Sequence, residues 1–355
     1  MKIGILTHQY INNYGAFLQA YALREAVAEM FPDDQVEIIN YMNVKHSLIN
    51  ILGWFRFYKD RENFKAWKQK IRVPRNFSNA RKNQMVMSPV CFTLNQVNKQ
   101  RYDCILVGSD EVWNFKDKKS NNPIKFGIGL ECSKLIAYAP SVGKSEYSSE
   151  LPKYVTEGLN KFKAISARDQ LTFELVSKVV GKEPTIVLDP TFLHGFPIEK
   201  APIPKKPYIL FYYCENLPNH IKNQILQYAL DNGLQVYGAG ECDKKYSSIT
   251  VNLKPFEWVD MFRNAEYVFT GTFHGAVFSI LNNCQFSVYL TNESRIRKVR
   301  ALLKELNIQN REIDEEFVLD LKTKDRVIDY NKVNEIVNVR RMESLEYLRK
   351  NINDI

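Results

Sequence analysis

The sequence predicts an α/β protein with two Rossmann-like, doubly wound domains that face each other across a cleft. Three observations support this prediction. The chain has 355 residues, which is the length of two ordinary domains. Short apolar runs alternate with helical stretches in both halves, as in parallel sheets covered by helices. A connection with four prolines separates the halves between residues 194 and 207, and prolines favour a stiff, non-helical linker.

The elements follow one another in a regular order in each half. In the first half we expect strands at 2–7, 36–41, 102–107, 134–139, 164–166 and 184–188, and helices at 16–30, at 152–161 and after 169. In the second half we expect strands at 208–213, 234–237, 267–270 and 285–290, and helices at 220–232, 255–263, 295–306, 331–351 and after 273. These elements predict an N-terminal domain at 1–196, a C-terminal domain at 207–330 and a C-terminal helix at 331–355.

Composition and cysteine spacing limit the class of protein. The chain contains 45% hydrophobic and 25% charged residues, as ordinary globular proteins do. No apolar run is long enough to cross a bilayer and the N-terminus lacks a signal-peptide pattern, so we expect a cytoplasmic protein. The cysteines occur without a C-x-x-C pair, which favours reduced core residues over disulfides or a metal site. They are Cys91, Cys104, Cys132, Cys214, Cys242 and Cys284.

A basic and aromatic insert at 44–82 interrupts the alternation. Between residues 56 and 82, ten lysines and arginines stand against two acidic residues, a net charge of +8, while the whole chain carries +9. The simplest interpretation is a helical excursion with a solvated charged face. An anionic membrane surface is the second interpretation. Basic residues between aromatics also occur in nucleic-acid-binding proteins, but we expect no nucleic acid here. The apolar residues at helical spacing are Ile51, Trp54, Phe55, Tyr58, Phe64, Trp67 and Ile71.

Small and polar residues follow several predicted strands of the first half. The carboxyl ends of parallel strands meet at one sheet edge, where open α/β sheets bind ligands. Asp110 is a candidate to accept a proton from a sugar hydroxyl, and Trp113 is a candidate to stack on a sugar ring. The plain alternatives are a helix cap for Asp110 and a core position for Trp113. The other candidate ligands on these loops are Asn13, Tyr14, Gly15, Ser109, Asn114 and Ser141.

Arg168 stands at the expected start of a helix, where the helix dipole favours anions over cations. This placement makes Arg168 a candidate anion ligand, because a planar guanidinium can hold a carboxylate or phosphate in a bidentate grip. The neighbouring Asp169 is a natural N-cap or an orienting partner of the arginine. The alternative interpretation is a simple structural pair of these two residues.

The stretch 267–280 reads YVFTGTFHGAVFSI and predicts a strand, a tight polar turn and a helix. Thr270, Thr272 and His274 lie at this turn, and Gly275 frees its backbone. The start of the helix offers unpaired N–H groups and a favourable dipole to an anion, and an imidazole exchanges protons near neutral pH. The alternative is that His274 only caps the helix or packs beneath a loop.

Five motifs in this order resemble the polysaccharide pyruvyl transferase family. They are NYGAFLQAYAL at 13–23, GSDEVWN at 108–114, SARD at 166–169, LDPT at 188–191 and TFHG at 272–275. Five ordered motifs are much more specific than any single one, and the resemblance extends from about residue 1 to about residue 310. The basic insert and the C-terminal helix lie outside it.

The resemblance implies a fold like that of the two-domain GT-B glycosyltransferases and transfer of pyruvate from phosphoenolpyruvate to two sugar hydroxyls as a ketal. The family associates the arginine of the SARD motif and the histidine before glycine with the donor, which assigns these roles to Arg168 and His274. Some members carry a further arginine where this chain has Thr272. Arg295 or Arg297 is a candidate to replace it.

The residues suit this chemistry. A donor with a phosphate and a carboxylate needs fixed positive charge and helix N-termini, and His274 can act as the acid or base. We expect no metal and no cofactor besides the donor substrate. The acceptor is expected to be a sugar or a lipid-linked saccharide precursor at the inner face of the cell membrane. A nucleotide-sugar glycosyltransferase and a non-catalytic sugar-binding relative remain the alternatives, the latter because Thr272 replaces an arginine.

Overall fold

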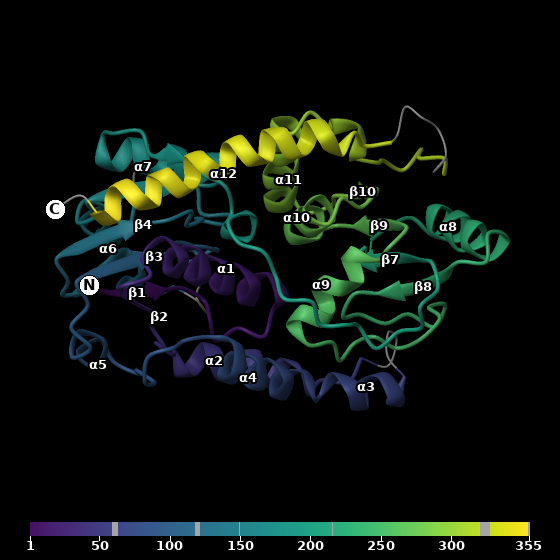
Figure 1. Cartoon of the computed structure of the whole chain (residues 1–355), viewed down its shortest axis with the longest axis horizontal. Helices are drawn as coiled ribbons and strands as arrows, with labels where there is room; N and C mark the ends of the chain where they lie inside the picture. Colours follow the sequence, from purple (N-terminus) through teal and green to yellow (C-terminus); the bar gives the residue numbers. More distant parts are fainter. Residues whose placement is uncertain (59–62, 118–120, 149, 215, 320–326, 354–355) are drawn as a thin grey trace. The chain divides into compact units, whose positions relative to one another are not determined.

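The computed structural model describes residues 1–58, 63–117, 121–148, 150–214, 216–319 and 327–353, and the chain forms two compact units (Figure 1). The first unit consists of Met1–Leu52, Arg81–Gly195 and Asn338–Ile355, and the second of Gly53–Ala80 and Phe196–Val337. One of the passages between the units, from Gly195 to Phe196, lies within the expected proline-rich connection, and the others follow Leu52, Ala80 and Val337. The division differs from the expected domains because part of the insert joins the second unit, and the C-terminal helix joins the first unit from Asn338 onward.

The first unit contains a parallel sheet of six strands in the order β2-β1-β3-β4-β5-β6, and the expected α/β class is confirmed. Parallel pairing requires crossover connections, which the helices between the strands provide. Every strand therefore ends at the same edge of the sheet. The strands are β1 (Lys2–Leu6), β2 (Gln35–Ile38), β3 (Cys104–Val107), β4 (Lys134–Ala137), β5 (Ala164–Ala167) and β6 (Thr185–Ile186).

Both faces of this sheet are buried. Side chains alternate along each strand, so successive residues join the cores on opposite faces. In β3, Cys104 and Leu106 join the core on the face covered by α1 (Tyr14–Met30) and by the end of α12 (Tyr330–Asn353). Ile105 and Val107 of the same strand join the core on the opposite face. That face is covered by η1 (Pro123–Phe126), α6 (Lys153–Leu159) and α7 (Gln170–Val180).

The last part of α12, drawn in yellow in Figure 1, belongs to the first unit because it completes the core there. Leu348 and Ile352 are fully buried. The Tyr347 hydroxyl donates to the carbonyl of Ala137 in β4 at 3.0 Å. The sequence predicted this helix but not its partner, since its apolar residues carry no information about which sheet they cover.

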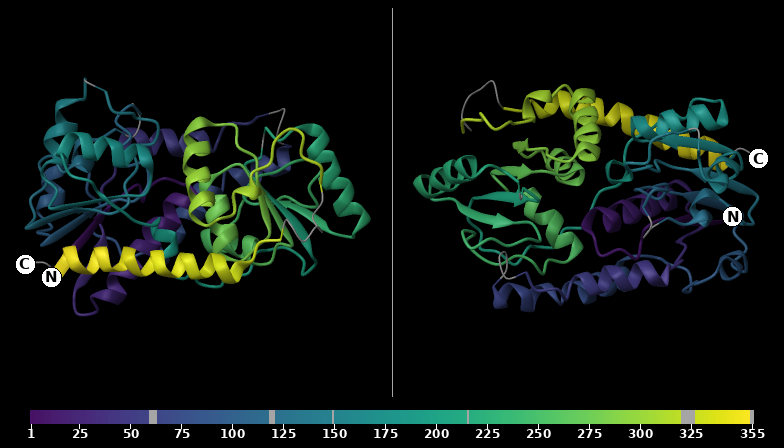
Figure 2. Two further views of the ribbon diagram at one scale, coloured as in Figure 1. Left: turned by 90° about the horizontal axis from the view of Figure 1, so that it is seen from above. Right: turned by 180° about the vertical axis from the view of Figure 1, so that it is seen from behind.

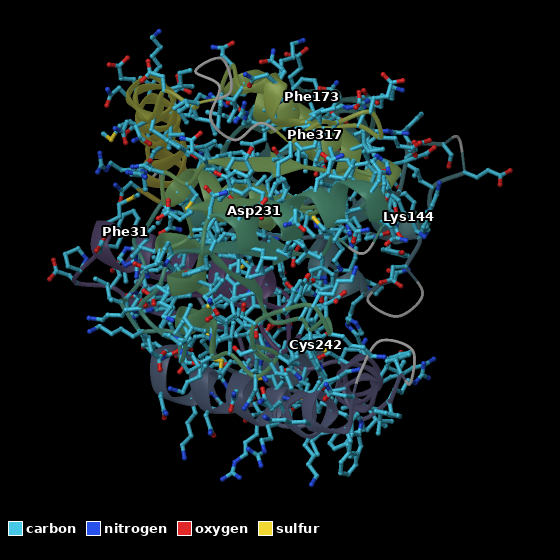
Figure 3. All side chains as sticks on the ribbon, turned by 90° about the vertical axis from the view of Figure 1, so that its right-hand side faces the viewer. Phe31, Lys144, Phe173, Asp231, Cys242 and Phe317 are labelled. Carbon is cyan, nitrogen blue, oxygen red and sulfur yellow. The ribbon has the colours of Figure 1, made fainter. Side chains whose placement is uncertain are left out.

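The second unit contains a parallel sheet of four strands in the order β10-β9-β7-β8 (Figure 2). Its apolar faces are likewise covered, and Phe317, labelled in Figure 3, packs in the same core cluster as Ile221 and Ile225 of α8. The strands are β7 (Tyr208–Tyr212), β8 (Gln235–Gly238), β9 (Tyr267–Thr270) and β10 (Phe286–Val288). The helices of this unit are α8 (Asn219–Asp231), α9 (Pro255–Arg263), α10 (Phe273–Leu281) and α11 (Glu293–Glu305), with the short 3-10 helix η3 (Gln309–Arg311). The 3-10 helix η2 (Pro190–Phe192) belongs to the first unit.

The insert is helical, as expected. It forms α2 (Val44–Gly53), α3 (Phe64–Lys70) and α4 (Val73–Gln84), and α5 (Leu94–Asn98) follows before β3. Lys59 and Arg61, which belong to its basic residues, and the opposing Asp60 and Glu62 lie outside the described residues.

No helix in the described parts of the chain is both long and apolar enough to span a membrane. Four of the six cysteines are buried, and Cys132 and Cys242 are partly exposed. The cleft expected between the two domains stays a prediction.

Candidate functional site

The buried side chain of Gln19 forms hydrogen bonds to two loops at the carboxyl edge of the first sheet. Gln19 lies on α1, donates to the Thr7 hydroxyl at 2.9 Å and accepts from the backbone N–H of Ser109 at 3.1 Å. Thr7 in turn donates to the Ser109 carbonyl at 3.1 Å. All three residues are fully buried. The glutamine of the NYGAFLQAYAL motif therefore connects the ends of β1 and β3 to α1.

Arg168 lies at the centre of a buried charge cluster at this edge. Its Nη1 donates to Asp189 and, at 3.1 Å, to the Ser109 hydroxyl, and its Nη2 lies 3.3 Å from Asp110 Oδ1. The side chain is only 4% exposed. Burial alone lowers the pKa of Arg168, but the carboxylates of Asp189 and Asp110 outweigh this effect and raise it. The guanidinium is thus a permanent cation that two carboxylates already neutralise.

The N-cap role expected for Asp169 is confirmed. Asp169 is the N-cap of α7, and its Oδ1 accepts from the backbone N–H of Thr172 at 3.0 Å. Arg168 itself precedes the cap, so it does not oppose the helix dipole. Its paired carboxylates are Asp110 and Asp189, which follow β3 and β6. Its role in holding a donor stays a prediction.

The aromatic candidate on the first sheet is a core residue. Trp113 is fully buried, its ring stacks on Phe126 with centroids 5.7 Å apart, and its Nε1 donates to the Lys125 carbonyl at 2.7 Å. The expectation that Trp113 stacks on a sugar ring is therefore wrong, because no face of the indole is open to solvent. The sequence Trp-Asn after a strand does not indicate whether the indole ring points into the core or toward the surface.

Other candidates of the first unit also make internal contacts. Ser141 is fully buried and its Oγ accepts from the backbone N–H of Gly143 at 3.1 Å. Asn114 is 7% exposed and donates to Glu111 at 3.2 Å. These hydrogen bonds indicate that Ser141 and Asn114 stabilise the loops after β4 and β3. Asp110, whose side chain is 19% exposed, remains partly open, as do Glu111 and Asp117 of the same loop.

The N-Y-G turn starts α1. Asn13 is exposed, and its Oδ1 caps the helix by accepting from the backbone N–H of Ala16 at 3.1 Å. Tyr14 and Gly15 are buried in the first turn. The expected plain turn between strand and helix is thus present, and a binding role of these three residues stays a prediction.

The structure adds a buried pair that the sequence did not single out. Lys125 lies on η1 with 1% exposure, and its Nζ is 2.6 Å from Nδ1 of His8, the second residue after β1. The other ring nitrogen of His8 lies 3.3 Å from the Glu111 carbonyl, which can only accept, so Nε2 carries the hydrogen. His8 follows a strand as the other candidates do, so the same rule would have found it. Nothing in the sequence indicates that Lys125 is buried.

Both groups of this pair have strongly shifted acidities. Burial, followed by the charge of Lys125, lowers the pKa of His8 to about 3. Burial lowers the pKa of Lys125 to about 7, although Asp110 and Asp117 act in the opposite direction. Strongly perturbed groups of this kind concentrate at functional sites.

The second unit forms the expected strand, turn and helix. Thr272 is the N-cap of α10, and its hydroxyl accepts from the backbone N–H of Gly275 at 3.0 Å. The buried Thr270 hydroxyl accepts from the backbone N–H of Thr272 at 3.2 Å. A Cβ on Gly275 would lie 1.9 Å from this hydroxyl, so only glycine fits. His274 is in the first turn of the helix, partly exposed, with its ring edge-on to Phe273.

A small pocket of about 150 Å³ opens at the same edge of the second sheet. Arg295, an exposed residue of α11, lines it and donates to the Gly271 carbonyl at 3.5 Å. The structure therefore brings Arg295 to the turn that carries Thr272 and His274. The other lining residues are Tyr213, Cys214, Asn216, Tyr289 and Thr291, which follow β7 and β10.

The family follows from a comparison of the sequence with family models. The model of the polysaccharide pyruvyl transferase family matches residues 13–293. This chain belongs to that family. All five motifs lie within the matched range, so the family supports a transferase that acts on polysaccharide and has a sugar acceptor. No curated protein matches the sequence.

Several solved structures resemble the whole chain at low sequence identity. A variant of the O-GlcNAc transferase from Thermobaculum terrenum is 9% identical with a TM-score of 0.46, covering 100% of this chain and 66% of its own. The glycosyltransferase SsfS6 from a Streptomyces species is 10% identical with a TM-score of 0.47, covering 99% of each chain. The UDP-GlcNAc 2-epimerase from Methanocaldococcus jannaschii is 10% identical with a TM-score of 0.47, covering 96% of this chain and 93% of that one.

Proposed function

We propose that this protein transfers a pyruvyl group from phosphoenolpyruvate to two hydroxyls of a sugar, giving a ketal and inorganic phosphate. The acceptor is part of a cell-surface polysaccharide or a lipid-linked precursor of one. Besides family membership, one observation carries the proposal: Arg295 of α11 lines a small pocket at the carboxyl edge of the second sheet and reaches the carbonyl of Gly271, three residues before His274.

The reaction needs two proton transfers and no redox step. A proton adds to the methylene carbon of the enol, and the first sugar hydroxyl bonds to the neighbouring carbon as it loses its own proton. The second hydroxyl then bonds to the same carbon, the carbon–oxygen bond to phosphate breaks, and phosphate leaves with the electron pair. Two hydroxyl protons are released, one matched by the proton now on carbon and one carried by the phosphate.

Four side chains are assigned roles in these steps. His274 supplies the proton to the enol carbon, since imidazole is both acid and base near neutral pH. Arg295 holds the anionic groups of the donor with its exposed guanidinium. Asp110 accepts a hydroxyl proton from the sugar. Arg168, which ion-pairs with Asp110, fixes the direction of that carboxylate.

The proposal is tested with the purified full-length protein, phosphoenolpyruvate and a panel of galactose, mannose and N-acetylmannosamine glycosides. We expect phosphate release that depends on the acceptor, and a sugar product that carries a pyruvate ketal by mass spectrometry. His274→Gln should abolish both, whereas His220→Gln, on the exposed surface of α8, should not. Sugar transfer from a nucleotide sugar in a parallel assay would instead establish a glycosyltransferase. Donor binding without any product would establish a binding protein.

We further propose that the insert binds the anionic surface of a phospholipid bilayer, at the inner face of the cell membrane. Among the described residues, nine exposed large apolar side chains fall between positions 44 and 64, an unusual density for a soluble surface. They are Val44, Leu48, Ile49, Ile51, Leu52, Phe55, Phe57, Tyr58 and Phe64.

The charges of the insert support an anionic bilayer as its partner. Lys68 and Lys70 lie over the rings of Phe64 and Tyr58 at 4.6 and 4.5 Å, so cations and aromatic rings occupy the same surface. Such mixed surfaces suit the interface between anionic headgroups and acyl chains. Each cation near that surface contributes about 1 kcal/mol.

Vesicle sedimentation tests this partner. We expect binding to vesicles with an anionic phospholipid, weaker binding at high salt and little binding to neutral vesicles. Replacing Lys65, Lys68 and Lys70 by glutamate should abolish binding. The matched control replaces three exposed lysines outside the insert, Lys99, Lys182 and Lys304. Unchanged sedimentation of the insert variant would refute the membrane role and leave the transferase proposal intact.

A further inference from the structure

The insert brings one arginine to the carboxyl edge of the first sheet, where the proposed function gives it no role. Arg81 lies on α4, and its Nη2 donates to Asn12 Oδ1 at 2.9 Å. Its Nη1 donates to the Gln9 carbonyl at 3.5 Å. No carboxylate in the described parts of the chain forms an ion pair with this guanidinium, which is partly buried. Removing a cation from water without a carboxylate partner is unfavourable, so its contacts with this one loop need an explanation.

Helix α2 of the insert holds the same loop, residues 8–13, at two further points. The backbone N–H of Asn12 donates to Asn50 Oδ1 at 3.0 Å. The Tyr10 hydroxyl lies 2.9 Å from Nδ1 of His46. Asn12 is only 5% exposed, and both its backbone N–H and its side-chain carbonyl are bonded to the insert. Two helices of the insert therefore determine where this loop lies.

The loop also borders the segment that carries Asp110. Strands β1 and β3 are neighbours in the sheet, so the loops that follow them lie side by side at its carboxyl edge. His8 Nε2 lies 3.3 Å from the carbonyl of Glu111, the residue after Asp110. The loop thus contacts the insert through Asn12 and the Asp110 segment through His8.

The loop ends in an exposed amide that has hydrogen-bond donors available. Asn13 Oδ1 accepts from the backbone N–H of Ala16 at 3.1 Å and caps α1. The side-chain nitrogen of Asn13 has no hydrogen-bond partner among the residues that the structure describes, and the side chain is exposed. An amide nitrogen offers two donors, and the hydroxyl oxygens of a sugar accept such bonds. Asn13 directly follows the residue that Arg81 holds.

We propose that Arg81 is a positioning residue for the acceptor sugar. It fixes Asn12, and the amide of the adjacent Asn13 then donates to a hydroxyl of the sugar whose neighbouring hydroxyl is deprotonated by Asp110. The inference rests on the acceptor role that the proposed function gives to this edge. It also separates Arg81 from the other basic residues of the insert, because its guanidinium bonds to the loop after β1 instead of facing solvent.

The order of the loop is measured without any substrate by hydrogen–deuterium exchange of the full-length protein. We expect the peptide that covers residues 8–13 to exchange about tenfold faster in Arg81→Met, as for the loss of one charge-assisted hydrogen bond. Arg81→Lys keeps the charge and one bond, and should give an intermediate rate. Lys82→Met is the matched control, since it removes one charge from the same turn of α4 at an exposed position. Its exchange in this peptide should equal that of the wild type.

Steady-state kinetics with the glycoside panel distinguish positioning from general support of the fold. Arg81→Met and Asn13→Ala should each raise the KM of the acceptor about tenfold, with kcat and the KM of phosphoenolpyruvate unchanged. Arg81→Lys should recover part of the acceptor affinity. Asn12→Ala combined with Arg81→Met should be no worse than either single variant, because each removes the same contact.

Each measurement has a result that overturns the inference. Exchange of residues 8–13 that is unchanged in Arg81→Met would do so, as would equal changes in the KM of donor and acceptor or additive effects of Asn12→Ala and Arg81→Met. Absence of any phosphoenolpyruvate-dependent product would instead overturn the proposed function. In that case saturation-transfer nuclear magnetic resonance with the same glycosides measures acceptor binding directly, and unchanged binding in Arg81→Met and Asn13→Ala would overturn the inference as well.

Discussion

The carboxyl edges of the two sheets differ in how they use charge. At the first edge, Arg168 is 4% exposed and paired with Asp110 and Asp189. At the second edge, Arg295 is exposed beside a pocket of about 150 Å³. The topology of a parallel sheet brings polar loops to both edges. Whether such an edge holds its charges internally or offers them to a ligand depends on how the side chains pair, which the topology does not determine.

This comparison assigns different tasks to the two edges. Under the proposed function, the closed edge of the first unit holds Asp110 in a fixed direction, and the open edge of the second unit would bind the donor and supply the proton. Each substitution below changes one edge and leaves the other unchanged. The comparison fails if a substitution affects a property other than the one named for it, whether activity, stability or donor binding.

The largest effect is expected from His274→Gln. Removing a general acid or base typically costs about 10²–10⁴-fold in rate, and the glutamine keeps a polar side chain in the first turn of α10. We expect kcat to fall by this factor while the free energy of unfolding stays close to that of the wild type. Steady-state phosphate release and urea unfolding measure the two quantities. If the free energy of unfolding falls enough to explain the lost activity, His274 is a structural residue.

Asp189→Asn should affect stability most strongly. The carboxylate is buried against Arg168, and its other oxygen accepts from the Thr191 hydroxyl at 2.7 Å. Leaving a buried guanidinium with one partner fewer typically costs about 3–5 kcal/mol. Urea unfolding should show this loss, whereas Asp231→Asn on the exposed end of α8 should lose almost nothing. Equal stabilities of the two variants would contradict the account of the closed edge.

Lys125 should make stability depend on pH. Its pKa is about 7 when folded and about 10.4 when unfolded, so the unfolded chain binds more protons between these values. The free energy of unfolding therefore rises with pH through this window, by about 1.4 kcal/mol per pH unit for one group. Below about pH 7 the lysine is protonated in both states and adds no further pH dependence. Lys125→Met should remove that slope, as measured by urea unfolding from pH 6 to about pH 9. The same slope in both proteins would mean that the lysine is not buried as a titrating group.

Gly275→Ala should destabilise the second edge. The added Cβ would lie 1.9 Å from the Thr270 hydroxyl, and overpacking of a buried site costs about 1–3 kcal/mol. Gly53→Ala at the end of α2 is the matched control, since a Cβ there meets nothing within 4 Å. Thermal unfolding compares the two variants. A neutral result for Gly275→Ala would show that the turn after β9 can relax.

The smallest effect is expected from Arg295→Gln. A charge-assisted hydrogen bond to a ligand is worth about 1.5–3 kcal/mol, and solvent exposure of the arginine places the loss at the lower end. We expect the Kd of phosphoenolpyruvate to rise about tenfold, with stability unchanged. Isothermal titration calorimetry gives the Kd, and Lys304→Gln on the same helix is the control. An unchanged Kd would remove Arg295 from the donor site.

The sequence predicted the fold better than the site. Strand and helix positions followed from apolar runs and turn residues, because these patterns are local. The turn of Thr272 and Gly275 was likewise predicted correctly, since a cap and a glycine are local features. The assignment of part of the insert and of the end of α12 to particular units was missed, since both depend on contacts between distant segments.

The site residues show what local patterns cannot provide. Trp113 was expected to meet a sugar and is buried in the core. Asp169 was expected as an N-cap or as a partner of Arg168 and is the N-cap of α7, whereas the carboxylates that pair with Arg168 are 58 and 21 residues away in the chain. Lys125 gave no signal at all, because charge on a lysine normally indicates the surface. Burial and long-range pairing determine the chemistry of these groups, and neither is visible in a single sequence.

The most direct test of the central claim follows the carbon atoms of the donor. Full-length protein is incubated with phosphoenolpyruvate labelled with ¹³C in all its carbons and with the acceptor panel, and the sugars are examined by mass spectrometry and nuclear magnetic resonance. We expect an acceptor that carries every labelled carbon in a ketal, one phosphate released per ketal, and neither product with His274→Gln. Labelled pyruvate in solution with unlabelled sugars, or label transfer that survives in His274→Gln, would contradict the account.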